Sequence, residues 1–208
     1  MERINIFIID SGVNINHSAF KNDDLKGFSY STTGISNNFE DEYGHGTAVY
    51  GIIRKVKDIA NITNIKINSI EKGIEENILF DLLDYISTNF HPDIINLSCG
   101  LNICENLNKF NQICNKLTNK GTIIVSAFDN AGAISYPAAF NNVIGVTTGH
   151  FCNNVNEFEY IEDSIVNIAA KGSIQRLAWI KPEYILLGGN SFACAHVTVQ
   201  IAKYLAEG

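Results

Sequence analysis

Long hydrophobic runs, an excess of basic charge and paired-cysteine motifs are all missing from this 208-residue chain. Its longest apolar stretches, at residues 6–9 and 185–187, are far shorter than the roughly 20 residues that cross a bilayer. The net charge of −7 argues against a nucleic-acid partner, because neutralising phosphates requires clustered lysine and arginine. No repeat, low-complexity tract or linker is visible, and the composition is that of an ordinary globular protein. We therefore expect a single folded domain over residues 1–208, with no nucleic-acid partner and no membrane partner.

The cysteines give no sign of a metal or redox motif. There are five of them, and none lies in a Cys-x-x-Cys arrangement: Cys99, Cys104, Cys114, Cys152 and Cys194. The first apolar stretch is too short for the hydrophobic region of a secretion signal, and no small-residue cleavage site follows it. Free thiols without a signal peptide predict a reducing, cytoplasmic location.

Short apolar segments rich in isoleucine and valine alternate with amphipathic segments of helix length. We expect strands at residues 4–9, 62–70, 93–98, 122–127 and 143–148. We expect helices at residues 73–89 and 106–119, where apolar residues recur at helical spacing, and from Ser191 to about residue 206. Strands that are apolar on both faces belong in a sheet covered on both sides. The predicted fold class is therefore α/β, a doubly wound, mostly parallel β-sheet with helices on both faces.

Three short segments carry residues that can perform chemistry. Asp10 ends the first expected strand, His45 lies between two glycines at the start of a helix, and Ser191 follows a glycine-rich turn. Taken singly, each has an ordinary interpretation: a turn aspartate, a structural histidine, a serine that caps a helix. Taken together, they follow the chain order Asp, His, Ser, which is the order of the catalytic triad in subtilisin, a standard example of that triad.

With these residues in place, the chain resembles the subtilisin-like family of serine peptidases. The matching text is Asp10-Ser-Gly, His45-Gly-Thr and residues 189–197, which read GNSFACAHV where the family typically reads Gly-Thr-Ser-x-Ala-x-Pro-x-Val. The resemblance extends to residues 95–100, similar to the strand that receives substrate, and to residues 125–132, similar to the segment with the oxyanion asparagine. It covers essentially the whole chain.

The resemblance implies catalytic roles for four residues. Ser191 would attack a peptide carbonyl, and His45 would take its proton and return it to the leaving amine. Asp10 would orient the imidazole. Asn130 and the main-chain N–H of Ser191 would hold the oxyanion.

The resemblance also implies a binding site for an extended peptide. Substrate would pair as an added strand with Ser98, Cys99 and Gly100, and Asp129 and Ser135 are expected to contact it as well. Asp129 replaces a family glycine in the pocket for the side chain that precedes the scissile bond. A carboxylate there would favour a basic side chain; alternatively, Asp129 points to solvent or bonds to nearby backbone.

We expect no metal ion and no cofactor. The helix after His45 runs nearly directly into the strand around Ile65, which leaves no room for the family's usual calcium loop. Ala19 stands where the family can supply a carboxylate ligand, and a calcium ion needs six to eight oxygen ligands. Ala195 replaces the proline of the family pattern. Nine residues precede Asp10, so neither a signal peptide nor a pro-segment is expected.

The sequence therefore predicts a serine endopeptidase. Without a pro-segment its activity must be restrained by narrow specificity, as in a cytosolic leader peptidase that matures a ribosomally made peptide. One alternative is a general protease of intracellular protein turnover. Another is a peptide-binding or scaffolding subunit with weak or no activity alone, which leaves a protein partner or an oligomer open. Macrocyclisation through the same acyl-enzyme would need a lid that excludes water, and no insertion is long enough to form one.

Overall fold

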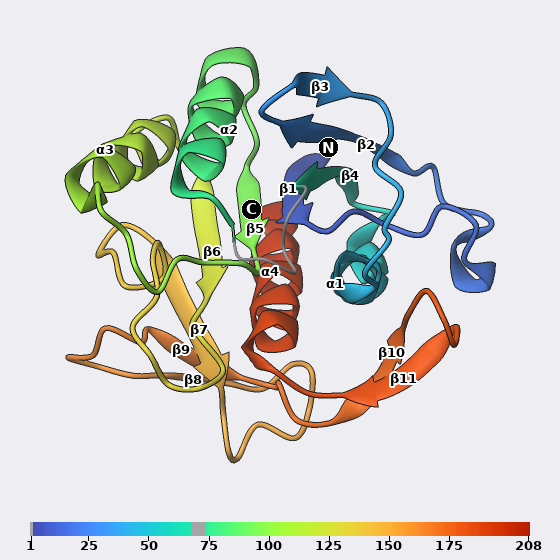
Figure 1. The fold of residues 1–208 in the computed structure, drawn as a ribbon. Helices are drawn as coiled ribbons and strands as arrows, with labels where there is room; N and C mark the ends of the chain where they lie inside the picture. The colour runs from blue at the N-terminus through green and yellow to red at the C-terminus, as the bar shows by residue number, and fades with distance from the viewer. Residues whose placement is uncertain (1, 68–73) are drawn as a thin grey trace.

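The computed structural model describes residues 2–67 and 74–208, which form a nine-stranded sheet and a separate two-stranded hairpin (Figure 1). The strands of the sheet are β1 (Ile4–Asp10), β2 (Lys26–Ser31), β3 (Gly34–Ser36), β4 (Ala60–Ile67), β5 (Ile94–Leu97), β6 (Ile123–Ala127), β7 (Ile144–Thr148), β8 (Phe158–Tyr160) and β9 (Ile168–Ala170). The hairpin consists of β10 (Gln175–Ala178) and β11 (Tyr184–Leu187). The helices are α1 (His45–Ile53), α2 (Glu76–Asn89), α3 (Leu107–Thr118) and α4 (Asn190–Glu207), with short 3-10 turns at Ser18–Phe20 and Arg54–Val56.

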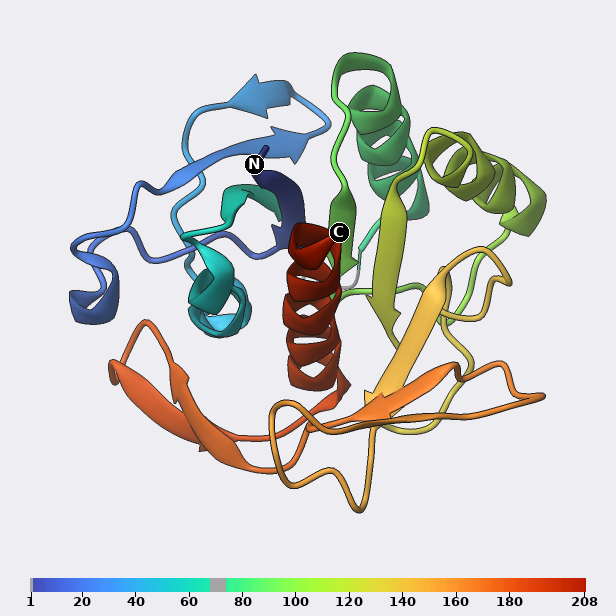
Figure 2. The same ribbon diagram turned by 180° about the vertical axis from the view of Figure 1, so that it is seen from behind.

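The strand order is β3-β2-β4-β1-β5-β6-β7-β9-β8. All pairs from β2 to β9 are parallel, and only the outermost strands, β3 and β8, pair antiparallel with their neighbours. Helices α1 and α4 cover one face, and α2 and α3 cover the other (Figures 1 and 2). The predicted doubly wound, mostly parallel α/β fold is confirmed.

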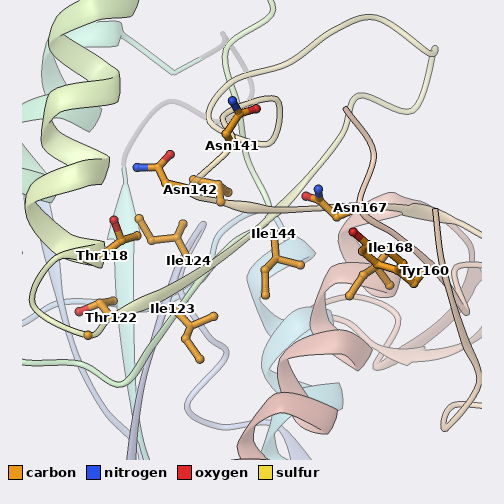
Figure 3. Close-up of a pocket in the computed structure, with 12 residues that line it drawn as sticks. Thr118, Thr122, Ile123, Ile124, Asn141, Asn142, Ile144, Tyr160, Asn167 and Ile168 are labelled. Atoms are coloured by element: carbon orange, nitrogen blue, oxygen red, sulfur yellow. The ribbon is translucent and has the colours of Figure 1, made fainter. Parts of the chain in front are cut away.

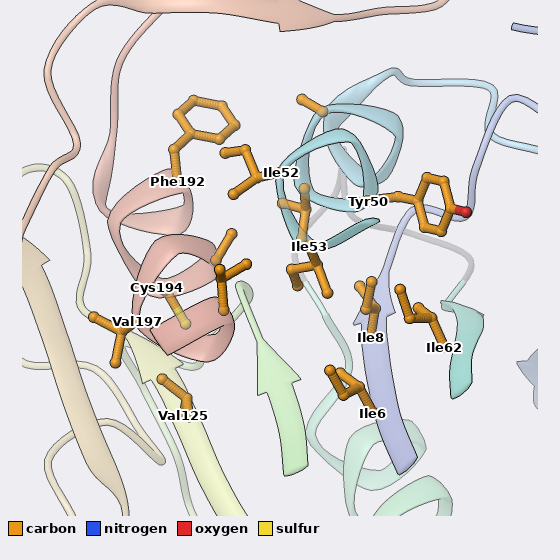
Figure 4. Close-up of a cluster of buried hydrophobic side chains, with 14 of the residues drawn as sticks. Ile6, Ile8, Tyr50, Ile52, Ile53, Ile62, Val125, Phe192, Cys194 and Val197 are labelled. Atoms are coloured by element: carbon orange, nitrogen blue, oxygen red, sulfur yellow. The ribbon is translucent and has the colours of Figure 1, made fainter. Parts of the chain in front are cut away.

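Strand β1 shows why both faces need a cover. Its side chains alternate, so that Ile6 and Ile8 pack with α1 and α4, whereas Phe7 and Ile9 pack with α2 and α3. Figure 4 shows the first of these clusters, in which side chains of β1 and α1 face Phe192 and its neighbours on α4. Because all four β1 side chains are buried, the strand reads as an unbroken apolar run.

The five strands expected from the sequence correspond to β1, β4, β5, β6 and β7. The helices expected at residues 73–89, 106–119 and from Ser191 correspond to α2, α3 and α4, and the helix expected to begin at His45 is α1. Residues 68–70 of the second expected strand and residue 73 of the first expected helix lie outside the described residues. The sequence missed the strands that flank this core. For example, β3 and β8 contain three residues each, all exposed, and so they lack the buried apolar run that marks the central strands.

Candidate active site

The predicted site residues lie at one edge of the sheet. Asp10 is the last residue of β1, Ser98 follows β5, and Asn130 lies three residues beyond the end of β6. Helices α1 and α4 begin at this same edge with His45 and, one residue after its start, Ser191. Because parallel strands bring their carboxyl ends to a common edge, residues far apart in the sequence meet there.

Asp10 and His45 form a hydrogen-bonded pair. The distance from His45 Nδ1 to Asp10 Oδ1 is 2.8 Å, and Asp10 is only 1% exposed. The same carboxylate oxygen accepts the main-chain N–H of Ser11 at 2.8 Å. Because an ionised carboxylate can only accept, the shared proton is carried by Nδ1. In the neutral imidazole, Nε2 is therefore left with a lone pair that can accept a proton.

A second buried carboxylate, Asp41, holds the segment that carries His45. It is 4% exposed and accepts four hydrogen bonds: from the main-chain N–H groups of Tyr43 and Gly44, and from the N–H and hydroxyl of Thr47. The donor distances lie between 2.6 and 2.9 Å. Asp41 thus satisfies N–H groups that the first turn of α1 leaves without partners. The sequence analysis missed it, although an aspartate just before a helix start is a recognisable signal.

These two carboxylates determine the charge state of the imidazole. Burial lowers the pKa of His45, but the neighbouring Asp10 and, to a smaller extent, Asp41 stabilise the imidazolium. The net effect raises the pKa of His45 above the ordinary value of 6.5. The lone pair on Nε2 is therefore lost as the pH falls through this raised pKa.

We expect Asp41→Asn to lower the pKa of His45, because one of the two carboxylates that stabilise the imidazolium loses its charge. NMR titration of the His45 ring protons measures this shift without reference to any activity. Glu42→Gln is the matched control, since it removes a charge from the adjacent residue, whose side chain is 80% exposed. An identical His45 titration curve in Asp41→Asn and in the unmodified protein would contradict the assigned role of Asp41.

Ser191 lies in the first turn of α4, beside His45. The rings of His45 and Phe192, the next residue of α4, are 5.6 Å apart between centroids. Ser191 is 7% exposed, and its hydroxyl donates to the main-chain carbonyl of Ser98 at 3.1 Å. A rotation about the Cα–Cβ bond of Ser191 is therefore needed to bring the hydroxyl to His45 Nε2.

Asn130 is held with one end of its amide engaged. Its Oδ1 accepts the main-chain N–H of Asn190 at 2.8 Å, and a Cβ at Gly189 would lie only 3.2 Å from the same oxygen. The Asn130 side chain is thus fixed against the turn that precedes Ser191. This arrangement leaves Nδ2 as the donor that can serve an incoming group.

Asn190 connects this turn to the ends of two strands by hydrogen bonds. The sequence analysis did not predict this role. The side-chain amide of Asn190 donates to the carbonyls of Phe128 and Asp129, both at 3.1 Å. Its Oδ1 accepts the N–H of Thr148 at 2.8 Å. At 7% exposure, Asn190 joins the ends of β6 and β7 to the start of α4.

Of the expected substrate-binding residues, Ser98, Cys99 and Gly100 follow β5 directly. The Cys99 thiol turns inward to the carbonyl of Ile9, at 3.6 Å, and burial together with the Asp10 charge raises the pKa of this thiol well above its ordinary value. The thiol is thus protonated at neutral pH and is no competing nucleophile. Gly100 has no room for a side chain, because a Cβ would lie 2.9 Å from the carbonyl oxygen of Tyr136.

Ser135 and Asp129 interact with each other and with nearby backbone. Ser135 is 2% exposed, and its hydroxyl accepts the Asp129 N–H at 3.1 Å, so it helps to hold the main chain of Asp129 in place. The Asp129 carboxylate accepts the N–H of Ala131 at 2.8 Å and the side-chain amide of Asn102 at 3.2 Å. The hydrogen bond from Asn102 contributes most to lowering the pKa of Asp129 below its ordinary value. One of these two partners is nearby backbone and the other is a side chain, and a contact of Asp129 with substrate stays a prediction.

A separate groove of about 510 Å³ lies at the opposite edge of the sheet (Figure 3). The starts of β6, β7 and β9 line it with Ile123, Ile144 and Ile168. Over residues 2–67 and 74–208, no group of three or more His, Cys, Asp or Glu side chains is arranged to hold a metal ion. In the same part of the chain, no helix is long and apolar enough to cross a membrane.

The sheet topology and the Asp–His–Ser edge define a subtilisin-like α/β protein. The chain matches the model of the subtilase family of peptidases over residues 2–207, and it belongs to that family. Homologues in this family are serine endopeptidases.

Individual relatives are distant. The chain is 27% identical over 215 residues to the minor extracellular protease Epr of Bacillus subtilis. The matched region covers 97% of this chain and 32% of that protein. It is 25% identical over 220 residues to the major intracellular serine protease of the same species, covering 97% of this chain and 68% of that protein. The solved structure of a cold-adapted subtilisin-like serine proteinase superposes with a TM-score of 0.79 at 22% identity, covering all of this chain (100%) and 77% of the other. This chain therefore spans about a third of the Epr protease.

Proposed function

We propose that this protein is a serine endopeptidase that works through an acyl-enzyme. The observation that carries the proposal is the 2.8 Å pair of His45 Nδ1 and Asp10 Oδ1, which leaves Nε2 basic beside the helix turn that bears Ser191. In the first step, Ser191 Oγ bonds to the peptide carbonyl carbon while its proton passes to His45 Nε2. The C–N bond then breaks, and the same proton goes to the leaving amine. Water, deprotonated by His45, hydrolyses the ester and restores the Ser191 hydroxyl.

Two donors would stabilise the oxyanion of the tetrahedral intermediate. One is Asn130 Nδ2, whose amide is oriented by the hydrogen bond from the N–H of Asn190. The other is the main-chain N–H of Ser191, in the first turn of α4, where N–H groups have no intrahelical acceptor. Such donors act most strongly when they are fixed in place before the charge develops.

The main-chain carbonyl of Ser98 would have two roles in this mechanism. It accepts the Ser191 hydroxyl at 3.1 Å, and a substrate that adds as a strand would offer its own N–H to the same segment. If the substrate N–H takes the lone pair of this carbonyl that now accepts the hydroxyl, the Ser191 hydroxyl loses its partner. Binding of substrate in this way would favour rotation of the hydroxyl toward His45.

The direct test is the intact mass of the protein after treatment with a fluorophosphonate. We expect one adduct per chain, and we expect none on Ser191→Ala. An adduct on both proteins, or on neither when both are folded, would overturn the proposal. Labelling that appears only when a peptide or partner is added would favour the second candidate, a subunit that is weakly active alone; the engagement of the Ser191 hydroxyl by Ser98 is the observation in its favour.

For the biological role, we propose narrow-specificity processing of a peptide in the cytosol, such as removal of a leader from a ribosomally made peptide. All five cysteines are unpaired, which suits a reducing compartment, and one relative is an intracellular protease. An endopeptidase in the cytosol must spare the cell's own proteins, and selectivity for one sequence is the simplest safeguard. Incubation with a denatured cell lysate, read by mass spectrometry of new N-termini, should show few cleavage sites. Many sites with little in common would instead indicate general protein turnover.

A further inference from the structure

The hairpin of β10 and β11 is connected to both helices that carry the expected base and nucleophile. It packs against α1 and runs directly into the start of α4 (Figures 1 and 2). Strand β11 ends at Leu187, and Ser191 follows after a short turn. In this turn the N–H of Gly189 donates to the carbonyl of Gly172, which precedes β10, at 2.8 Å. This bond closes the base of the hairpin and fixes it to the turn before Ser191.

The far end of the hairpin is fixed by a shared acceptor. The main-chain carbonyl of Glu183 accepts the N–H of Trp179 at 2.8 Å and lies 2.8 Å from Nε2 of His17. Because His17 Nδ1 accepts the N–H of Ala19 at 3.1 Å, the proton of the neutral ring is on Nε2, which donates to Glu183. The hydroxyl of Ser18 also donates to the carboxylate of Glu183, at 2.9 Å. The main chain of Trp179 is therefore held in place from outside the hairpin.

The indole of Trp179 lies directly on Gly44, the residue before His45. A Cβ at Gly44 would lie 2.7 Å from Cδ2 of the indole and 2.8 Å from Nε1. Gly44 also has a φ of 107°, in the left-handed region that favours glycine. It is buried, although the neighbouring Tyr43 is 43% exposed. The backbone conformation and the indole thus exclude a side chain at Gly44 independently of each other.

Gly44 determines how α1 leaves the loop before it. Its N–H donates to Asp41 at 2.9 Å, and its carbonyl accepts the N–H of Ala48, in the first turn of α1, at 3.1 Å. Since His45 is the first residue of α1, a shift of Gly44 would move the imidazole and its 2.8 Å bond to Asp10. A glycine can adopt many backbone conformations, so its contacts must select one of them. The Trp179 indole is one of these contacts.

We propose that Trp179 is a positioning residue: by packing on Gly44, it holds His45 where it can exchange a proton with Ser191. This inference rests on the proposed peptidase function and adds to it a residue that acts through Gly44. Because the hairpin continues into the turn before Ser191, one element that is fixed at both ends sets the positions of base and nucleophile together.

The test compares Trp179→Ala with Trp179→Phe. We expect Trp179→Ala to lower kcat between about 10- and 100-fold, because a misplacement of ~1 Å between reacting groups can cost about 10²-fold. KM should change less than about two-fold, since the substrate contacts remain. Trp179→Phe keeps an aromatic ring over Gly44 and should recover most of the loss. The matched control is Tyr204→Ala, which removes a 61% exposed aromatic ring near the end of α4 and should leave kcat unchanged.

A second measurement follows His45 without hydrolysis. In a Ser191→Ala background, NMR gives the rate at which the Nδ1 proton of His45 exchanges with water. We expect this exchange to be faster when Trp179→Ala is added, because the bond to Asp10 is then less well held. A role in stability alone would lower the unfolding midpoint and leave both this exchange and the kcat of the folded protein unchanged.

Gly44→Ala tests the contact from the other side. Its Cβ would meet the indole, so Gly44→Ala should cost less kcat in a Trp179→Ala background than in the unmodified protein, although the unfavourable φ remains. Equal losses in the two backgrounds, or Nδ1 exchange that does not respond to Trp179, would overturn the inference. If Trp179→Ala does not fold, Trp179→Leu against Trp179→Phe gives the same comparison of an aliphatic and an aromatic cover.

Failure of this inference can be told apart from failure of the peptidase function. A protein that takes no fluorophosphonate adduct, but whose Nδ1 exchange depends on Trp179, refutes the peptidase function and leaves the positioning of His45 standing. An active enzyme with the same kcat in Trp179→Ala refutes the role of Trp179 alone.

Discussion

Ser191→Ala should lower kcat by about 10⁶-fold, because removal of the nucleophile leaves only binding and oxyanion stabilisation. The structure explains why removal of Ser191 Oγ alone should lower kcat this much. Ser191 Oγ is the hydroxyl at the start of α4 beside His45, and the Cys99 and Cys194 thiols near the site both have raised pKa values caused by burial. No thiolate is therefore available there to replace the hydroxyl. Single-turnover hydrolysis of a peptide ester by purified protein measures the remaining rate.

His45→Ala should be about as damaging, and the double variant should be little worse than either single one, because the two residues act as one unit. Ser36→Ala, at an exposed serine of β3, is the control for the effect of a serine-to-alanine change itself. Residual activity of a few per cent in Ser191→Ala would mean that another group performs the attack. Additive losses in the double variant would mean that His45 does not activate Ser191.

The sequence predicted the positions of Asp10, His45 and Ser191 because each follows or begins a strongly patterned element. An apolar strand that ends in an acid places that acid at the carboxyl edge of a parallel sheet. A glycine-rich turn before an apolar helix places its first polar side chain at the same edge. The local pattern and the layer rules of α/β folds thus place these residues at one edge, whereas their catalytic roles were predicted from the chain order Asp, His, Ser and from the resemblance to the family.

The supporting contacts could not be predicted in this way. Asn190 contacts carbonyls 61 and 62 residues away in the chain, and Asn102 meets Asp129 across 27 residues. Each of these contacts depends on loop geometry that short-range patterns do not encode. The direction of the Ser191 hydroxyl, toward the Ser98 carbonyl, is likewise a property of the packed site.

Asn130→Asp should lower kcat about 10²- to 10³-fold, the cost of losing one oxyanion donor. The substitution is nearly isosteric, and the aspartate can still accept the N–H of Asn190 through Oδ1, as the asparagine does at 2.8 Å. The turn before Ser191 therefore stays in place. The change is confined to Nδ2, an N–H donor, which becomes a carboxylate oxygen that repels a developing negative charge. Steady-state hydrolysis should show the loss in kcat, with KM changed far less, because the donor acts in the transition state.

A matched exchange elsewhere separates this effect from that of an added charge. Asn141 is exposed and lines the groove at the opposite edge of the sheet, so Asn141→Asp adds the same charge away from the reacting atoms. It should leave kcat within about two-fold, because exposed charges at long range are screened by salt. If Asn130→Asp loses less than ten-fold, the main-chain N–H of Ser191 is sufficient to hold the oxyanion. If KM rises while kcat is retained, Asn130 binds the ground state of the substrate, and the orientation of its amide by Asn190 serves recognition in place of catalysis.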